Sequence, residues 1–321
     1  MSPVTLPLAT SLLLVMACTP RGDDTHPDAD TDTDTDADTD TDTDADADTD
    51  TDADADTDTG PAPDYAATGP WAVAQGGGSF DAGGGCTMAY DTWTPEDAPE
   101  APLVLLSHGF SRSRAMQANV AAHWASWGFV VVTPDLCHNS MWDSDPPADA
   151  EALVALVDAL GVAQVIYAGH SAGGERSVLA AAADPRSVAV LGHDLVDSDD
   201  YALTAAPGLG VPLFDIVGEP GDCNSDGNGL PVVRAAANHG LLRVTEADHC
   251  DFEDPTEPGC TFLCGGTNDQ FTDDELRATI RALSTASLLW QSGLDARGSQ
   301  YWTPGQPAHD ALVATGAVST P

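Results

Sequence analysis

The stretch that decides the fold is Val165-Ile-Tyr-Ala-Gly-His-Ser-Ala-Gly-Gly-Glu-Arg176. Its first three residues favour a strand, and an alanine-rich run at 177–183 favours a helix. Ser171 stands between them in a Gly-x-Ser-x-Gly frame, whose glycines permit a sharp turn without Cβ clashes. Such a turn lifts the serine hydroxyl above the sheet edge and leaves the Ala172 N–H free to bind an oxyanion. The pattern therefore predicts a nucleophilic serine, with an ordinary strand-to-helix turn as the alternative.

Length and charge limit the classes of protein to which the chain can belong. At 321 residues there is room for one α/β domain of about 200–250 residues with appendages. The basic residues are ten arginines, against 52 acidic residues, and residues 61–321 alone carry 34 acids and nine arginines. A surface this acidic repels nucleic acid and anionic lipid, so we expect no nucleic-acid partner.

The N-terminus has the features of an export signal. Residues 6–17 form an apolar run that is too short for a transmembrane helix. The run ends in Ala17-Cys18, which resembles the lipobox of bacterial lipoproteins. This resemblance implies cleavage after residue 17, acylation of Cys18 and, because Thr19 rather than Asp follows, an outer-membrane or cell-surface location. A soluble secretory signal is the alternative.

A tether is expected between the lipidated cysteine and the folded domain. Residues 22–60 are almost entirely Thr-Asp and Ala-Asp dipeptides, without aromatic residues or aliphatic residues larger than alanine. Repeated like charges with nothing to bury predict a disordered, extended segment. A low-affinity Ca²⁺ sponge is the alternative, but no glycine-turned loop gathers the carboxylates. We therefore expect a signal peptide at 1–17, a tether at 18–60 and a catalytic domain at 61–321.

The remaining pattern alternates strands with helices. Strand-like runs cover residues 86–93, 103–106, 129–134, 165–167, 188–191, 211–217 and 241–244, and helical patterns cover 115–127, 147–160, 177–183 and 273–294. Such alternation predicts an α/β fold with a mostly parallel sheet and helices on both faces. The Gly-x-Ser-x-Gly turn narrows this class to the α/β-hydrolase fold.

The serine needs a base and an oxyanion site. In this fold the base follows the last main strand, where His249 stands, and His309 is its only later rival. His108, His170 and His193 follow strands, and we interpret them as neighbours of the site. A second oxyanion donor should come from the loop after residues 103–106, where Gly109 permits close approach and the Phe110 N–H can join that of Ala172.

The acid of the triad must orient the imidazole of the base, and three aspartates are positioned to do so. Asp194 follows the strand after the nucleophile helix, and Asp197 lies three residues later. Asp222 follows the next strand. Both strand ends lie beside the serine in this fold, so position alone leaves the choice open.

Family resemblance bears on this choice. The motifs that carry it are Ser107-His-Gly-Phe110, Gly169-His-Ser-Ala-Gly-Gly174, Gly192-His-Asp-Leu-Val-Asp197, Cys223-Asn-Ser-Asp-Gly-Asn228 and His249-Cys-Asp-Phe252. Over residues 69–295 the chain resembles the chlorophyllase-like branch of α/β-hydrolases, relatives of the plasma platelet-activating-factor acetylhydrolases. More distantly, it is similar to bacterial cutinase-like polyester hydrolases. The first group implies Asp194 as the acid and the second implies Asp222; the motif set is closer to the first.

Cysteine usage predicts disulfides rather than a metal site. Six cysteines remain after Cys18, and fifteen pairings are available to them. Export favours disulfides, and we expect Cys260–Cys264 from proximity, Cys223–Cys250 because their loops meet in this fold, and Cys86–Cys137 by elimination. The sequence has no second pair of cysteines at the spacing of zinc ligands, so it does not indicate a zinc site. The run 222–227 mimics half of an EF-hand loop but lacks the closing glutamate, so we expect no metal.

These features together predict a serine esterase. Ser171 would attack a carboxylic ester, His249 would transfer the proton, and Asp194 would orient His249. Water would release the acyl-enzyme, and no cofactor is needed. Family resemblance implies a small or polymeric ester of lipid, short-acyl or polyester type. A peptidase or amidase on the same triad and a non-catalytic surface-binding module are the alternatives.

Overall fold

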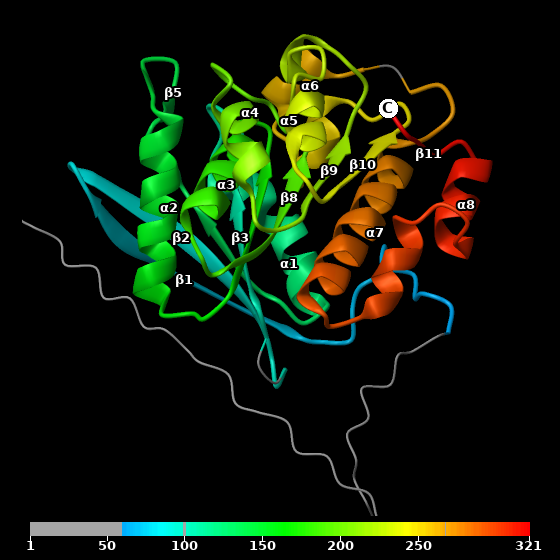
Figure 1. Cartoon of the computed structure of the whole chain (residues 1–321), viewed down its shortest axis with the longest axis horizontal. Helices are drawn as coiled ribbons and strands as arrows, with labels where there is room; N and C mark the ends of the chain where they lie inside the picture. Colours follow the sequence, from blue (N-terminus) through cyan, green and yellow to red (C-terminus); the bar gives the residue numbers. More distant parts are fainter. Residues whose placement is uncertain (1–59, 99–100, 267) are drawn as a thin grey trace, which may run out of the picture. The chain divides into compact units, whose positions relative to one another are not determined.

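Strands of uninterrupted apolar residues form the middle of a nine-stranded sheet (Figure 1). The computed structural model describes residues 60–98, 101–266 and 268–321. In spatial order the strands are β1 (Val73–Gly83), β2 (Cys86–Pro95), β4 (Val130–Pro134), β3 (Leu103–Ser107), β7 (Val165–His170), β8 (Ser187–His193), β9 (Leu213–Val217), β10 (His239–Val244) and β11 (Val318–Ser319). Neighbours from β4 to β10 pair in parallel, and β1–β2, β2–β4 and β10–β11 pair antiparallel. The expected α/β class with a mostly parallel sheet is therefore confirmed.

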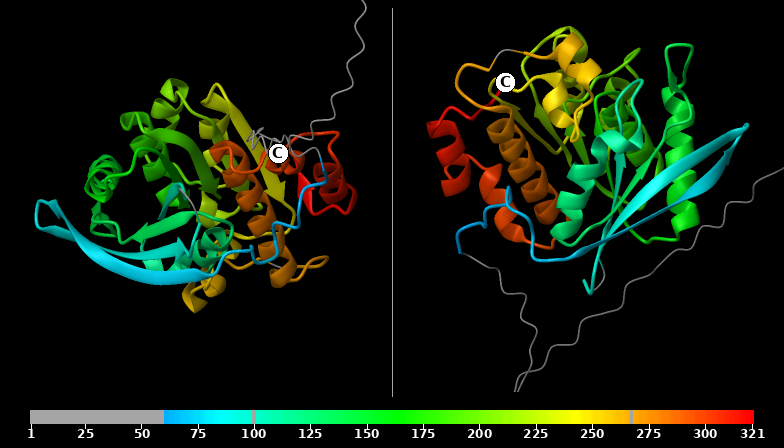
Figure 2. Two further views of the ribbon diagram at one scale, coloured as in Figure 1. Left: turned by 90° about the horizontal axis from the view of Figure 1, so that it is seen from below. Right: turned by 180° about the vertical axis from the view of Figure 1, so that it is seen from behind.

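Alternate residues of the central strands build two cores, one on each face of the sheet. In β3, Val104 and Leu106 join the first core, whereas Leu103 and Leu105 join the second. Burial of both faces explains the continuous apolar runs in the sequence. Helices α1 (Ala118–Ser126) and α7 (Asp273–Ser292) cover the first face, and α2 (Pro146–Leu160), α3 (Ala172–Ala183), α4 (Tyr201–Ala205) and α5 (Gly229–Ala235) cover the second. Figure 2 shows the sheet with helices on both sides.

Shorter elements surround the carboxyl ends of the parallel strands. They are the hairpin β5 (Asn139–Ser140) and β6 (Asp143–Ser144), helix α6 (Pro258–Cys264), and 3₁₀ helices at Asp222–Asn224 and His249–Phe252. Helix α8 (Pro307–Ala314) precedes β11. No helix in the described part of the chain has the length and apolar character required to cross a membrane.

Two strands of the nine-stranded sheet, and the β5–β6 hairpin, lie where the sequence indicated no strand. The glycine-rich stretch after residue 72 forms β1, which pairs with β2 and is joined to it through Gly83, Gly84 and Gly85 at positive φ. Residues after 299, which had no expected structure, supply α8 and β11. The expected signal peptide, the lipidated Cys18 and the tether lie outside the described residues.

Three disulfides use all six cysteines of residues 60–321, but two of the three expected pairings are wrong. Cys86–Cys137 is confirmed, whereas the other bridges are Cys223–Cys264 and Cys250–Cys260 rather than Cys223–Cys250 and Cys260–Cys264. The reason is α6, which carries Cys260 and Cys264 and presents each to a different loop. The sulfurs of Cys250, Cys260 and Cys264 lie within 4.8 Å of one another, so the expected partners are close but bonded to others.

Disulfide mapping of a non-reduced digest should join Cys223 to Cys264 and Cys250 to Cys260. Because a longer closed loop restricts the unfolded chain more, the Cys86→Ser/Cys137→Ser variant should lose about 4 kcal/mol of unfolding free energy and the Cys250→Ser/Cys260→Ser variant about 3 kcal/mol. The sequence separations are 51 and 10 residues. Urea denaturation measures both losses. A digest that joined Cys260 to Cys264 would contradict the assignment.

Candidate active site

Ser171 lies in a strained turn between β7 and α3. Its backbone has φ 56° and ψ −127°, a region that costs a non-glycine residue of order 1–3 kcal/mol. The Ser171 N–H donates to the His193 carbonyl oxygen (3.0 Å), and its own carbonyl oxygen accepts from Gly174 (2.9 Å) and Val196 (3.2 Å). These bonds fix the strained conformation from both sides. The junction therefore has the geometry that the Gly-x-Ser-x-Gly frame predicted.

Close packing explains the glycines around the serine. A β-carbon at Gly169 would lie 2.3 Å from the Gly173 backbone, and one at Gly173 would lie 2.5 Å from the Ser107 carbonyl oxygen. Real β-carbons do not approach other atoms so closely, and all of these neighbours are backbone. The first turn of α3 can therefore lie against the ends of β3 and β7 only because both side chains are absent.

His249 is bonded to Asp194, the aspartate that the motif set favoured. The His249 Nδ1 lies 2.6 Å from the Asp194 Oδ2, and both residues are buried. The Asp194 carboxylate also accepts from the Gly218 N–H (3.0 Å) and from the Asn224 side-chain amide (3.1 and 3.3 Å). A buried carboxylate requires such donors to offset its lost hydration. This set holds the imidazole with Nδ1 toward Asp194 and leaves Nε2 for other chemistry.

The rival residues lie elsewhere. Asp222 is exposed in the 3₁₀ helix Asp222–Asn224, and no hydrogen bond joins its side chain to His249. Asp197 accepts from the N–H groups of Ala202 and Leu203 and thereby caps α4. His309 lies in α8 beside Asp310. The structure thus joins Asp194 and His249 and assigns neither Asp222 nor Asp197 to the pair.

The two expected oxyanion donors flank the serine. Gly109 packs against it, since a β-carbon there would lie 3.1 Å from the Ser171 Cβ and 3.0 Å from the His170 Nδ1. Phe110, Ser171 and His249 line one cavity of about 270 Å³. Within the described residues, neither the Phe110 N–H nor the Ala172 N–H donates to a protein acceptor. Both are therefore available to a bound oxygen.

The three strand-end histidines are buried and neutral. Burial lowers the pKa of His108, lowers that of His193 to about 3, and lowers that of His170 well below its usual value, with His249 nearby as a further cause. His170 has a structural contact to the site, because its Nε2 lies 3.0 Å from the His249 carbonyl oxygen. His193 packs edge-on against Trp124, with ring centres 5.4 Å apart. None of the three is suited to accept a proton from Ser171 at neutral pH.

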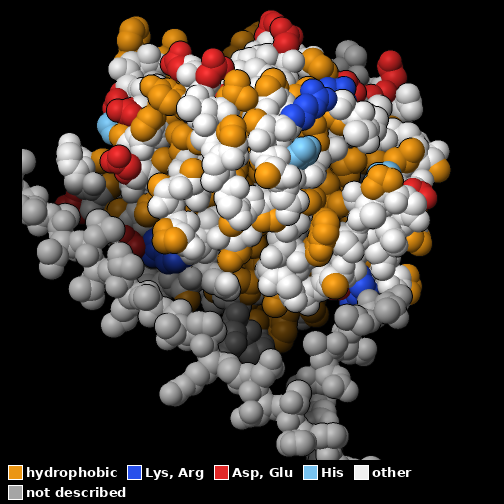
Figure 3. All heavy atoms as spheres, viewed as in Figure 1, with side chains coloured by type: hydrophobic (Ala, Val, Ile, Leu, Met, Phe, Trp, Pro, Cys, Tyr) orange, Lys and Arg blue, Asp and Glu red, His pale blue; other side chains and the backbone are white. Residues whose placement is uncertain are grey.

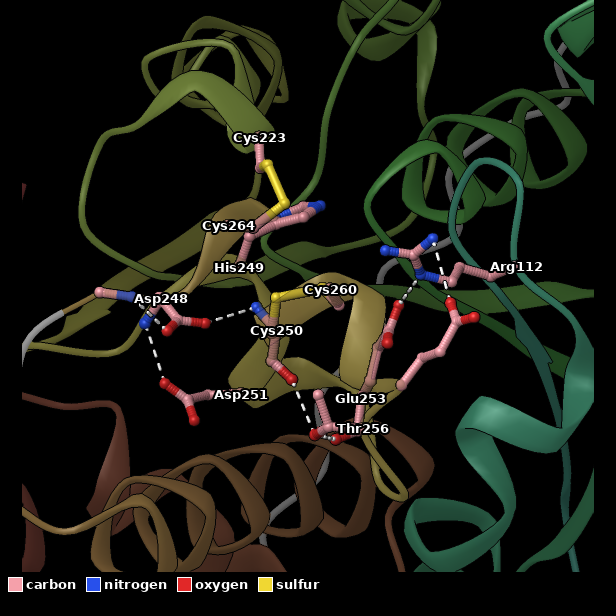
Figure 4. The surroundings of a disulfide bond; sticks show 12 residues. Arg112, Cys223, Asp248, His249, Cys250, Asp251, Glu253, Thr256, Cys260 and Cys264 are labelled. Atoms are coloured by element: carbon pink, nitrogen blue, oxygen red, sulfur yellow. Dashed lines mark hydrogen bonds and ion pairs between the residues drawn. A yellow bond between two sulfur atoms is a disulfide. The ribbon is translucent and has the colours of Figure 1, made fainter. Parts of the chain in front are cut away.

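Covalent and ionic links hold the loop that carries His249. Figure 4 shows its imidazole beside the Cys223–Cys264 bridge, while the next residue, Cys250, is tied to α6. On the other side of the cavity the Arg112 Nε lies 2.7 Å from the Glu253 Oε1, in the same figure. Burial raises the pKa of Glu253, and the Arg112 charge opposes this increase. These links orient the loop with respect to the sheet.

Several of the residues that support the site were not predicted from the sequence. Asn224 appeared in a half EF-hand pattern and in one of the resemblance motifs, but it was given no role, although its side-chain amide donates to Asp194. The Gly218 backbone donor has no sequence signature beyond its position after β9. Asp215, fully buried in β9, lies behind the Asp194 turn, where its Oδ1 accepts weakly from the Leu195 N–H (3.5 Å). These residues could be predicted only by knowing which strand ends lie next to one another in the folded sheet.

The described residues bring three potential metal-ligand atoms together at one place, the sulfurs of Cys250, Cys260 and Cys264. All three are bonded in disulfides and offer no thiolate. Comparison of the sequence with protein-family models gives no match, and comparison with curated proteins gives no significant match.

The His249 Nδ1 proton should give a far-downfield ¹H NMR resonance. A short bond to a buried carboxylate deshields this proton, so Asp194→Asn should abolish the signal. Asp222→Asn should retain it, because that carboxylate does not touch the imidazole. A signal lost in Asp222→Asn and kept in Asp194→Asn would reverse the assignment of the acid.

Acid should destabilise the protein in part through His193. Its pKa is about 3 in the folded protein and 6.5 in the unfolded chain, so below pH 6.5 the unfolded state binds the extra proton. Between pH 7 and pH 4.5 this linkage removes about 3 kcal/mol of stability, and His193→Phe should abolish that share. Urea denaturation of both proteins at the two pH values measures the difference. Equal losses in the two proteins would refute it.

Proposed function

We propose that the protein is a serine hydrolase of carboxylic esters with the α/β-hydrolase fold. The observation that carries the proposal is the 2.6 Å His249–Asp194 contact, made beside a cavity that Ser171 also lines. Strand order supports the fold assignment, since the nucleophile strand β7 lies centrally and α3 begins directly after Ser171. The position of Asp194 after β8 agrees with the chlorophyllase-like branch.

Each group has a defined role in the proposed reaction. The Ser171 Oγ forms a bond to the ester carbonyl carbon, and His249 Nε2 accepts the hydroxyl proton. The N–H groups of Phe110 and Ala172 stabilise the oxyanion, and His249 returns the proton to the departing alcohol. Water then repeats the sequence on the acyl-enzyme. Asp194 holds the imidazole tautomer and stabilises the imidazolium, and no cofactor takes part.

Exposed apolar side chains around the site favour an apolar acyl group. Phe110 and Met141 line the cavity with Ser171, and both are substantially exposed. Trp142, next to Met141 in the β5–β6 hairpin, is 94 % exposed, and Phe262, two residues before the cavity residue Cys264 in α6, is 87 % exposed. Large apolar groups rarely cluster on a protein surface without a binding role. They support an ester of lipid, short-acyl or polyester type.

We also propose that the protein acts outside the cytoplasm. Three disulfides support an oxidising compartment, where such bonds persist. The lipobox-like sequence before Cys18 supports an outer-membrane or cell-surface lipid anchor. The acidic composition supports a role without nucleic acid.

The purified protein should hydrolyse p-nitrophenyl acetate and butyrate. Ser171→Ala should reduce kcat to near the uncatalysed rate, because no other hydroxyl occupies the elbow. Asp194→Asn should reduce kcat by about 10⁴-fold, since it stabilises the wrong imidazole tautomer. Asp226→Asn, an exposed change at positive φ in the same region, should leave activity unchanged and serves as the matched control.

The same assay separates the alternatives. A wild-type rate no higher than that of Ser171→Ala would reject the esterase and favour the non-catalytic binding module. Cleavage of p-nitroanilides at rates equal to those of the matching esters would favour the amidase. Covalent labelling of Ser171 by a fluorophosphonate, lost in Ser171→Ala, would establish the nucleophile independently of the substrate chosen.

A further inference from the structure

Two loops that carry different parts of the proposed catalytic machinery are joined by an ion pair. The loop after β3 (residues 108–113) carries one expected oxyanion donor, and we call it the oxyanion loop. The loop after β10 (residues 249–257) carries the proposed base, and we call it the base loop. The Arg112 Nε lies 2.7 Å from the Glu253 Oε1, a contact drawn in Figure 4. Both residues line the cavity of Ser171, so the pair joins the two loops at the cavity itself.

Short spacings in the sequence place both partners close to the groups that act on the substrate. Arg112 follows Phe110 by two residues. Glu253 follows His249 by four residues and ends the 3₁₀ helix that begins with His249. Segments this short allow little independent movement, since even an extended chain covers at most about 3.5 Å per residue. Displacement of either partner would therefore move the Phe110 N–H or the imidazole.

Burial makes this ion pair costly for stability. Basic side chains are sparse in this acidic protein, including on the face drawn in Figure 3, so a cation beside a buried carboxylate is a distinctive feature. The side chain of Glu253 is fully buried, that of Arg112 is 19 % exposed, and the Glu253 Oε2 has no hydrogen-bond partner among the described residues. Because desolvation offsets much of the attraction in such a pair, its place at the cavity points to fixed geometry rather than to stability.

His170 connects the ion pair to the proposed nucleophile, because it directly precedes Ser171 in the chain. Its Nε2 lies 3.0 Å from the His249 carbonyl oxygen, and its Nδ1 lies 3.7 Å from the Glu253 Oε1. A β-carbon at Gly109 would lie 3.0 Å from the same Nδ1, so the oxyanion loop also packs against this ring. The residue next to the nucleophile thus contacts both loops, and the ion pair holds them around it.

The base loop has other attachments, which do not depend on the ion pair. The Asp254 N–H donates to the Met116 carbonyl oxygen (2.9 Å), and the Asn119 N–H donates to the Asp254 carbonyl oxygen (2.9 Å). The Asn119 side-chain amide also donates to the Asp254 carboxylate (2.7 Å). The Cys250–Cys260 bridge ties the start of the loop to α6. A variant without the ion pair should therefore fold, with its two loops less precisely held.

We propose that Arg112 and Glu253 are positioning residues, which hold the oxyanion loop and the base loop at the separation that the transition state requires. This inference rests on the proposed esterase function. Negative charge develops on the substrate oxygen only during acylation and deacylation, and both steps use the Phe110 N–H and the His249 imidazole. Displacement of these groups slows both steps and leaves substrate binding intact. The expected kinetic signature is a lower kcat at a nearly constant KM.

The test measures hydrolysis of p-nitrophenyl butyrate by Arg112→Gln and by Glu253→Gln. Each variant should lower kcat about 10- to 100-fold, since a displacement of about 1 Å can cost about 100-fold in rate. KM should change by less than about twofold, because the lost stabilisation belongs to the transition state. The double variant should be no slower than the slower single variant, because the two residues act as one unit.

The ion pair of Arg186 and Asp184 provides a matched control. Its side chains are 22 % and 1 % exposed, and the Arg186 Nε lies 2.8 Å from the Asp184 Oδ1. Arg186 also contacts one exposed carboxylate, as Arg112 does. The control pair lies at the end of α3, and neither residue lines the Ser171 cavity. Arg186→Gln should therefore shift the urea unfolding midpoint by an amount similar to Arg112→Gln and leave kcat unchanged.

A transition-state analogue gives a measurement that does not depend on turnover. Butylboronic acid forms a tetrahedral adduct with the serine hydroxyl, and one of its oxygens occupies the oxyanion site. In Arg112→Gln its inhibition constant should rise by about the factor by which kcat/KM falls, because both quantities report transition-state binding. Arg186→Gln should leave the inhibition constant unchanged.

The outcomes distinguish this inference from the proposed function. Ser171-dependent hydrolysis with an unchanged kcat in Arg112→Gln and Glu253→Gln would overturn the positioning role and leave the esterase intact. A raised KM at unchanged kcat would also overturn it, since Arg112 would then bind the substrate directly. An equal loss of kcat in Arg186→Gln would overturn it as well, because the effect would then follow general stability. Absence of any Ser171-dependent hydrolysis would overturn the esterase itself and, with it, this inference.

Discussion

A carboxylate buried at the end of a parallel strand needs hydrogen-bond donors from several directions. In this site the carboxylate is that of Asp194, and three groups lie around it. One donor is the backbone of the turn after β9, one is the amide of Asn224, and the third is His249, 55 residues away along the chain. Each comes from a loop at the carboxyl ends of the strands. The parallel order of β7, β8, β9 and β10 brings these loops to one edge, so sheet topology is a precondition of the hydrogen-bond set.

The four histidines at this edge of the sheet have different environments. Burial lowers the pKa of three of them, His108, His170 and His193, although carboxylates lie 3.9 Å from the His108 ring and 3.7 Å from the His170 ring. His249 instead has a carboxylate at 2.6 Å on one nitrogen and borders a cavity. Residue type alone cannot show which histidine contacts Asp194. The place in the fold can, because only His249 follows β10, in the loop that faces the end of β8.

Much of the fold could be predicted from the sequence, for a physical reason. Strands buried on both faces must be apolar throughout, so β3 and β7 appear as uninterrupted runs, and the glycines around Ser171 mark a close backbone approach. β1 was missed because its glycines have no side chains to form a pattern, and pairing with β2 alone makes it a strand. The disulfide partners depended on α6, a short helix whose position no local signal specifies. The family motifs favoured Asp194 over Asp222, but only the distances show which of the two carboxylates contacts His249.

The two bridges at α6 have a consequence for when the site can assemble. The segment that carries His249 has little sheet structure of its own, and covalent ties to α6 and to the loop at Cys223 supply the constraint that a strand would otherwise provide. With its thiols reduced, the chain would lack that constraint, and the contacts to Asp194 and His170 would have to position the loop of His249 without it. Under the proposed function, bridge formation would be a maturation step, because the loop that carries His249 gains this constraint only on oxidation.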